Sequence, residues 1–359
     1  MNADAQLNKG SRRESWLDIL RGVTITLVIF HHCYLTTAAM LTEAGSGLHL
    51  PWYSVDRMLG MVRMPAFFLC SGILFSTVAS RGWSWFLRKR LAWTIWIAMV
   101  WGWIAACVLV LGVDLYPWGT PGQIRLSQWA LITPIGNMWF IYAIAILAAW
   151  SMVLVNTGKA ASFILSIVLA VTALLLYRYT ELPAGIDNLV LNLGYRGFVF
   201  FSMGFVFAKT LLKTRKIRGI HASLALAVWT VCYFIHSQAT GPHDLLRLLL
   251  SIPATLSVVY ALRYLVIKCP QIWRPFELLG RRSLELFLTH QFIIALTFIL
   301  LHPLVGHIIG DGLVAILFVL TLALSIMVSA VLRRAPSNAF FALPSGLFSR
   351  TQRNPNAAG

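Results

Sequence analysis

The sequence predicts an all-α protein, a polytopic bundle whose chain crosses a membrane about ten times with both termini in the cytoplasm. Hydrophobic residues make up 58% of the 359 positions, whereas Asp, Glu, Lys and Arg together make up only 11%. A water-soluble protein has roughly 25% charged residues. The mean hydropathy is +0.76, and apolar stretches long enough to cross a bilayer recur along the chain. These three observations exclude a soluble enzyme, a disordered chain and a fibrous protein.

Ten stretches satisfy the requirement of about 20 mainly apolar residues for a transmembrane helix. In chain order they are 18–41, 57–79, 91–113, 134–155, 160–178, 190–211, 220–239, 245–267, 282–302 and 309–332. The first follows Lys9, Arg12 and Arg13, as the apolar region of a signal peptide would. It is too long for such a region and lacks a small-residue cleavage site, so we expect it to be retained as the first membrane helix.

The segments between the helices are short. The fourth and fifth helices are separated only by residues 156–159, and the longest outer loops are 42–56 and 114–133. We therefore expect no soluble domain on either side of the membrane. Residues 1–334 are predicted to form one transmembrane domain, and 335–359, which are rich in proline and polar residues, a loose cytoplasmic tail.

The charge distribution supports this topology. The chain has 29 Lys and Arg against 12 Asp and Glu, a formal net charge of +17. Of the 29 basic residues, 23 fall in the predicted cytoplasmic ends and loops, as the positive-inside rule requires. The six on the other side are Arg57, Arg63, Arg125, Arg178, Arg196 and Arg247. The basic excess is therefore explained by topology, and we expect no nucleic-acid partner.

The five cysteines lie far apart and mostly inside apolar runs, with no CxxC pair and no histidine at zinc-ligand spacing. They are typical of small buried hydrophobic side chains. The sequence therefore predicts neither a disulfide framework nor a metal site.

The first predicted helix carries charged and ionisable residues on one face. Arg21 and His32 are eleven residues apart, which at 100° per residue places them about 20° from each other and roughly 16 Å apart along the axis. Asp18 lies one turn before Arg21 and is expected to pair with it, whereas His31 lies about 100° off this face. Ionisable groups inside a membrane are costly and indicate function by default. The alternatives are an interfacial anchor for Arg21 and a packing role for His32.

The second helix contains Arg63 inside an apolar run, followed by Pro65 and by the small pair Ser71-Gly72. Proline frees backbone carbonyl groups, and small residues permit close helix packing. Arg63 is less easily explained as an anchor than a residue at a helix end. A kink with an interfacial arginine is the alternative.

The ninth helix begins with Ser283 and Glu285 and reaches His290 two turns later. Ser283 and His290 share one face, and Glu285 lies on another. An intramembrane carboxylate is expected to pair with a cation or a backbone donor. His290 is either a functional histidine or one that forms a hydrogen bond between helices.

The three clusters together resemble the acyltransferase 3 family of integral membrane acyltransferases. The stretch from Asp18 to Gly22, followed by His32, is similar to the family's Arg-x10-His signature, and the Arg63-Met-Pro-Ala-Phe-Phe stretch is similar to its second-helix pattern. The Arg88-Lys89-Arg90 segment resembles its cytoplasmic basic loop. Further similarities are Met138-Trp139-Phe140 and the stretch that contains Gly280, Ser283 and His290.

The resemblance implies transfer of an acyl group, usually acetyl, from cytoplasmic acyl-CoA to a hydroxyl of a carbohydrate. The acceptors it implies are lipopolysaccharide, exopolysaccharide or a lipid-linked precursor, and the location is the bacterial inner membrane. It implies the form without an appended esterase-like domain. The oligomeric state is left open, as are the acyl group and the modified position.

Acyl transfer to a hydroxyl needs a base, a group that stabilises the developing oxyanion, and a cationic site for the anionic donor. We expect His32 to be the base, and Arg63 or His290 to stabilise the oxyanion or orient the acyl group. Arg21, Arg88 and Arg90 are expected to bind the phosphates of acyl-CoA. The rival hypothesis is a transporter or flippase, because intramembrane Arg and His also mark substrate paths. No inverted repeat supports it.

Overall fold

A computed structural model describes residues 15–43, 50–110, 138–183, 186–213, 218–238, 244–301, 310–334 and 339–344. Throughout these ranges the regular structure is helical, which confirms the all-α prediction. Nine of the described helices are long and apolar enough to cross a membrane. The shorter apolar helix α7 (Trp139–Leu154) corresponds to the fourth predicted span. Each of the ten predicted spans therefore coincides with an apolar helix.

Several spans are made of more than one helical segment. The elements in chain order are α2 (Ser15–Glu43), α3 (Leu50–Gly60), α4 (Arg63–Ser76), η1 (Ala79–Arg81), α5 (Gly82–Trp85), η2 (Phe86–Leu91), α6 (Ala92–Val110), α7, α8 (Lys159–Tyr179), α9 (Ile186–Asn192), η4 (Leu193–Gly197), α10 (Phe198–Val206), α11 (Ala208–Lys213), α12 (Gly219–Gln238), α13 (Asp244–Lys268), α14 (Arg274–Arg281), α15 (Ser283–Leu301) and α16 (Gly310–Arg333).

The second span is broken rather than kinked. Helix α3 ends at Gly60 and α4 begins at Arg63, so the break falls at residues 61–62. Pro65 is the third residue of α4, where its missing N–H costs no intrahelical hydrogen bond. The proline therefore lies in the first turn of a new helix, directly after Arg63.

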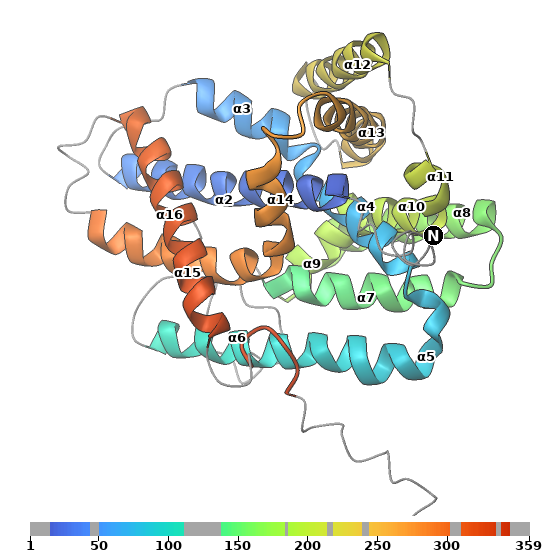
Figure 1. Cartoon of the computed structure of the whole chain (residues 1–359), viewed down its shortest axis with the longest axis horizontal. Helices are drawn as coiled ribbons and strands as arrows, with labels where there is room; N and C mark the ends of the chain where they lie inside the picture. Colours follow the sequence, from blue (N-terminus) through green and yellow to red (C-terminus); the bar gives the residue numbers. More distant parts are fainter. Residues whose placement is uncertain are drawn as a thin grey trace, which may run out of the picture.

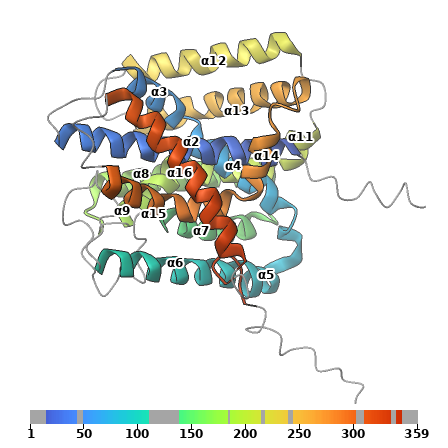
Figure 2. The ribbon, with the colours of Figure 1, turned by 60° about the vertical axis from the view of Figure 1, so that its left-hand side comes forward.

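Helix α2 lies in the middle of the bundle and contacts α4, α14, α15 and α16 (Figures 1 and 2). Helices α12 and α13 pack on each other at one edge of the molecule, and α6 lies at the opposite edge (Figures 1 and 2). This arrangement places the residues of α2 against the next span, α4, and against three helices from the other end of the sequence, α14, α15 and α16.

The contact between α2 and α14 depends on two glycines. A methyl group at Gly280 would lie 1.7 Å from the carbonyl oxygen of Asp18, and one at Gly22 would lie 1.8 Å from the carbonyl oxygen of Phe276. Both distances are far below van der Waals contact, so any larger side chain forces the backbones apart. Small residues at such crossings are typical of membrane helix packing. The crossing brings the start of α15 beside the start of α2.

The described part of the C-terminal segment, residues 339–344, packs against α6. Indole N–H groups of α6 donate to three successive backbone carbonyl groups: Trp93 to Phe341 (3.1 Å), Trp96 to Ala339 (2.7 Å) and Trp101 to Phe340 (2.8 Å). The Phe341 ring is buried and stacks on Trp101 with centroids 5.9 Å apart. These bonds satisfy carbonyl groups that have no helical partner. The division of the chain at residue 334 stays a prediction.

Candidate functional site

The two histidines of the predicted site meet across the bundle. His32 lies on α2 and His290 on α15, 258 residues away, yet the Nδ1 of His32 is 3.2 Å from the Nε2 of His290. Their ring centroids are 5.2 Å apart, and the ring planes are inclined by 24° to each other. His290 is fully buried, whereas His32 is partly exposed. The structure therefore brings together two residues that the sequence placed only on separate helices.

The hydrogen bonds of His290 determine which ring nitrogens carry protons. Its Nδ1 lies 3.0 Å from the backbone carbonyl oxygen of Leu286, which can only accept, so this Nδ1 must be protonated. In a neutral imidazole the Nε2 of His290 is then an acceptor, and the Nδ1–H of His32 donates to it. In a neutral His32 ring that is protonated at Nδ1, the lone pair is on Nε2. This assignment makes His32 Nε2 a proton acceptor that is held in place by His290.

Arg63 is bound to a carboxylate that the sequence analysis did not single out. Its Nη1 donates to the Oδ1 of Asp56 at 3.0 Å, and the Nδ1 of His31 lies 2.8 Å from the same oxygen. Arg63 is only 4% exposed. The His31 ring is 5.2 Å from the His32 ring, so Arg63 is connected to the histidine pair through Asp56 and His31.

Asp56 could have been recognised in the sequence. It lies at the edge of the second predicted span and seven residues before Arg63, which places both on the same face of a helix. An acidic residue at this spacing from an intramembrane arginine is a signal for an ion pair.

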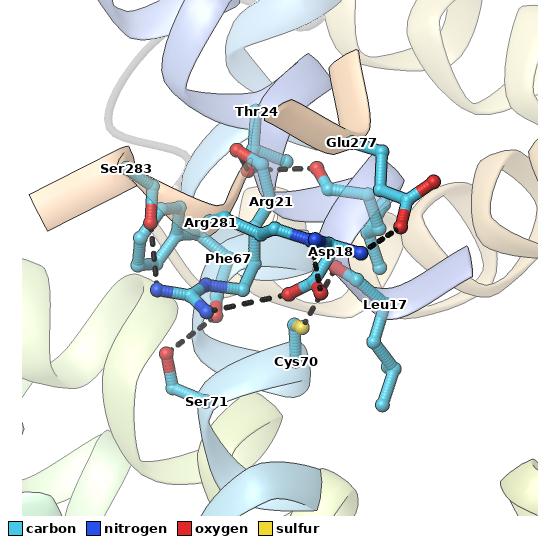
Figure 3. A network of polar contacts seen from close by, with 11 residues as sticks. Leu17, Asp18, Arg21, Thr24, Phe67, Cys70, Ser71, Glu277, Arg281 and Ser283 are labelled. Carbon is cyan, nitrogen blue, oxygen red and sulfur yellow. Dashed lines mark hydrogen bonds and ion pairs between the residues drawn. The ribbon is translucent and has the colours of Figure 1, made fainter. Parts of the chain in front are cut away.

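On the predicted cytoplasmic side, Arg21 connects α2 to the start of α15. Its Nη2 donates to the Oγ of Ser283 at 2.7 Å, and its Nη1 is 3.7 Å from the Oδ1 of the buried Asp18 (Figure 3). Asp18 is also 3.7 Å from Arg281, which pairs with Glu277 at 2.5 Å. The predicted pairing of Asp18 with Arg21 is confirmed. Arg21 remains partly accessible, with 19% of its side chain exposed.

Two arginines of the π-helical segment η2 differ in their surroundings. The guanidinium of Arg90 lies 4.8 Å above the Trp93 ring and within electrostatic range of Arg21. Its buried Nε has no hydrogen-bond partner among the described residues. Arg88 is exposed, and no described contact brings it to Arg21. Of the three arginines predicted to bind the donor, Arg21 and Arg90 therefore lie within electrostatic range of each other, whereas Arg88 is at the surface.

Glu285 forms an ion pair with Arg333 at the end of α16. An intramembrane carboxylate is expected to pair with a cation or a backbone donor, and the pair with Arg333 confirms this prediction. Glu285 therefore ties α15 to α16, next to the turn that carries Ser283. Among the described residues no group of three His, Cys, Asp or Glu side chains could hold a metal ion.

The geometry thus combines a partly exposed imidazole on α2, hydrogen-bonded to a buried one on α15, with arginines of α2 and η2 on the predicted cytoplasmic side. A comparison with protein families finds that residues 14–334 match the model of an acyltransferase domain, that of the acyltransferase 3 family. Comparisons with curated proteins and with solved structures find no match. The match covers nearly the whole chain, including His32, His290 and the arginines of the candidate site. The chain therefore belongs to the acyltransferase 3 family of multi-pass membrane acyltransferases.

Proposed function

We propose that this protein is an O-acyltransferase of the bacterial inner membrane that uses acyl-CoA, most often acetyl-CoA, as its donor. The acceptor is a hydroxyl of a cell-surface or exported glycan, or of its lipid-linked precursor. The observation that carries the proposal is the pair formed by His32 and His290, because it leaves the Nε2 of His32 as a proton acceptor inside an apolar bundle.

The reaction begins when the acceptor hydroxyl oxygen attacks the thioester carbonyl carbon of acyl-CoA. The hydroxyl proton passes to the Nε2 of His32, and the charge that develops on the ring is shared with His290 through their hydrogen bond. The tetrahedral intermediate collapses, the carbon–sulfur bond breaks, and the proton passes from His32 to the CoA sulfur. The products are an O-acyl ester and CoA with a free thiol. His290 is a positioning residue in this scheme.

Arg63 supports this chemistry as part of a charged network rather than as a direct neighbour of the histidine pair. Its positive charge is bound to Asp56, and Asp56 also holds His31 against His32. Through these contacts Arg63 and Asp56 together hold the His31 ring beside that of His32.

The cations at the predicted cytoplasmic end support a binding site for the donor there. Arg21 is partly exposed, and the Nε–H of Arg90 has no acceptor among the described residues, so both are suited to phosphate oxygens. Arg88, at the surface, attracts the polyanionic donor at longer range. The rise of roughly 16 Å between Arg21 and His32 suits a donor whose phosphates stay at the cytoplasmic end while its thioester reaches the histidine pair.

The experiment uses the purified protein in lipid vesicles with radiolabelled acetyl-CoA and membranes of a deletion strain as the source of acceptor. The wild type should release CoA thiol and label the acceptor. His32→Ala should lose both activities while inserting normally, and the control His221→Ala, an exposed histidine on α12, should retain them. Glycan transport without consumption of donor would instead establish a transporter and refute the proposal.

A further inference from the structure

Three arginines converge in the half of the bundle opposite Arg21. They are Arg63 on α4, Arg196 on η4 and Arg247 on α13. All three belong to the six basic residues that fall on the outer side of the predicted topology. Each of the three spans that carry them begins at that side. The positive-inside rule therefore does not account for their position.

The convergence is visible around Gly60, at the end of α3. A methyl group at this glycine would lie 3.8 Å from the Nη2 of Arg63 and 3.9 Å from the Nη2 of Arg247. The ends of both guanidinium groups therefore reach the same point. Arg196 lies within electrostatic range of both. Three separate segments thus direct positive charge into one region.

The backbone is irregular where two of these arginines lie. Arg63 directly follows the break between α3 and α4, and Arg196 lies in the π-helical segment η4. At membrane depth, irregular backbone is tolerated where protein or a water-filled cavity surrounds it, and transporters place their substrate sites at such breaks. Single π-helical turns inside α-helices are likewise frequent at functional sites.

The described neighbours do not balance the positive charge. Asp56 binds Arg63 and His31. Asp244 accepts a hydrogen bond from the hydroxyl of Tyr195. The guanidinium of Arg247 lies 5.2 Å from the centroid of the same tyrosine ring.

The third arginine, Arg196, has a hydrogen bond to a neutral side chain. Arg196 donates its Nη1 to the side-chain amide oxygen of Asn192 at 2.5 Å. Among the residues that the structure describes, the region therefore contains three guanidinium groups and two carboxylates. Like charges that are held together out of water repel one another strongly, so an anion is favoured there.

We propose that Arg63, Arg196 and Arg247 form a binding site for an oxyanion of the acyl acceptor, either a sugar carboxylate or a phosphate of its lipid carrier. Guanidinium groups bind both through paired hydrogen bonds. The site lies next to the histidine pair, because Arg63 is bound to Asp56 and Asp56 to His31. An anion held here positions the rest of the acceptor near His32. This inference rests on the proposed function for the identity of its ligand.

The test is ligand binding, which needs no acyl-CoA. The thermal unfolding of the purified protein in detergent is followed with four probes. Methyl β-glucuronide and decaprenyl phosphate carry the anion, and methyl β-glucoside and decaprenol are their neutral counterparts. We expect one of the two anionic probes to raise Tm in a saturable manner and its neutral counterpart to leave Tm unchanged. A response to the glucuronide alone identifies a sugar carboxylate, and a response to the phosphate alone identifies the lipid carrier.

The variants Arg196→Gln and Arg247→Gln should each weaken the binding by about tenfold or more, because each removes a charge-assisted hydrogen bond. Arg247→Lys keeps the charge and should bind more tightly than Arg247→Gln. The control Arg178→Gln, at an exposed position on α8, should bind as the wild type does. Two independent positions are used so that a variant that fails to fold does not decide the result.

The proposal is overturned if neither anionic probe binds, or if folded Arg196→Gln and Arg247→Gln bind as tightly as the wild type. Its failure is distinguishable from failure of the proposed function. If the wild type binds neither anionic probe but still releases CoA from acyl-CoA, only the anion site is refuted. Saturable anion binding in a protein that consumes no acyl-CoA refutes the acyltransfer reaction and leaves the anion site in place.

Discussion

The hydrogen bond between His32 and His290 leads to a specific kinetic prediction for His290→Leu. Leucine keeps most of the buried volume but cannot accept the Nδ1–H of His32. The ring of His32 then loses the contact that fixes its tautomer and its orientation. Because the bond strengthens as His32 takes up a proton, its loss should appear in kcat rather than in KM for acyl-CoA.

The magnitude follows from the strength of this bond before and during proton transfer. A hydrogen bond between neutral groups contributes about 1 kcal/mol, and one to a charged group about 2–3 kcal/mol. The transition state therefore gains about 1–2 kcal/mol more than the ground state. At 1.36 kcal/mol per factor of ten, His290→Leu should lower kcat by about 5- to 30-fold. Removal of the base itself in His32→Ala should lower it by about 10²- to 10⁴-fold.

The assay is steady-state release of CoA thiol by the protein in vesicles with saturating acceptor membranes. His290→Gln is the matched variant, because its amide oxygen can accept from His32, and it should recover part of the lost kcat. A kcat for His290→Leu within twofold of the wild type would refute the positioning role. A loss as large as that of His32→Ala would show that His290 itself contacts the reacting atoms.

Two further substitutions test the packing and the donor site. Gly280→Ala places a methyl group 1.7 Å from the carbonyl oxygen of Asp18, so Tm should fall by several degrees. The control Gly102→Ala, which has open space around it, should leave Tm unchanged. Equal Tm values for both variants would contradict the close crossing of α2 and α14. Arg90→Gln should raise KM for acetyl-CoA by about tenfold with little change in kcat, because a phosphate contact made equally in ground and transition states affects binding alone. Arg88→Gln, at an exposed position, should raise KM less, and mainly at low salt. A larger rise in KM for Arg88→Gln than for Arg90→Gln would contradict the assignment of the phosphate contact to Arg90.

The sequence predicted the helical class and the ten spans because both follow from local composition. A stretch of about 20 apolar residues must be helical in a bilayer whatever its neighbours are. Of the fourth predicted span, 134–155, residues 134–137 lie outside the described part, and α7 covers residues 139–154 of the rest. The face shared by Arg21 and His32 was likewise predictable, because it depends only on helix geometry.

The partners of these residues were not predictable in the same way. The meeting of His32 and His290 depends on the close crossing of α2 with α14, which Gly22 and Gly280 permit. Nothing within either helix specifies that contact. Asp56 was assigned to a loop edge because boundaries of spans are uncertain by a few residues. A count of the basic residues on each side of the membrane likewise could not reveal that Arg63, Arg196 and Arg247 lie close together in the fold.

The central claim is that His32 is the base for acyl transfer to a glycan. The most direct measurement is mass spectrometry of the envelope glycans from a deletion strain that carries wild-type, His32→Ala or His221→Ala protein at equal membrane levels. The deletion should remove one acyl mass from a glycan. The wild type and His221→Ala should restore it, and His32→Ala should not. Full acylation by His32→Ala, or no loss of an acyl mass in the deletion strain, would contradict the claim.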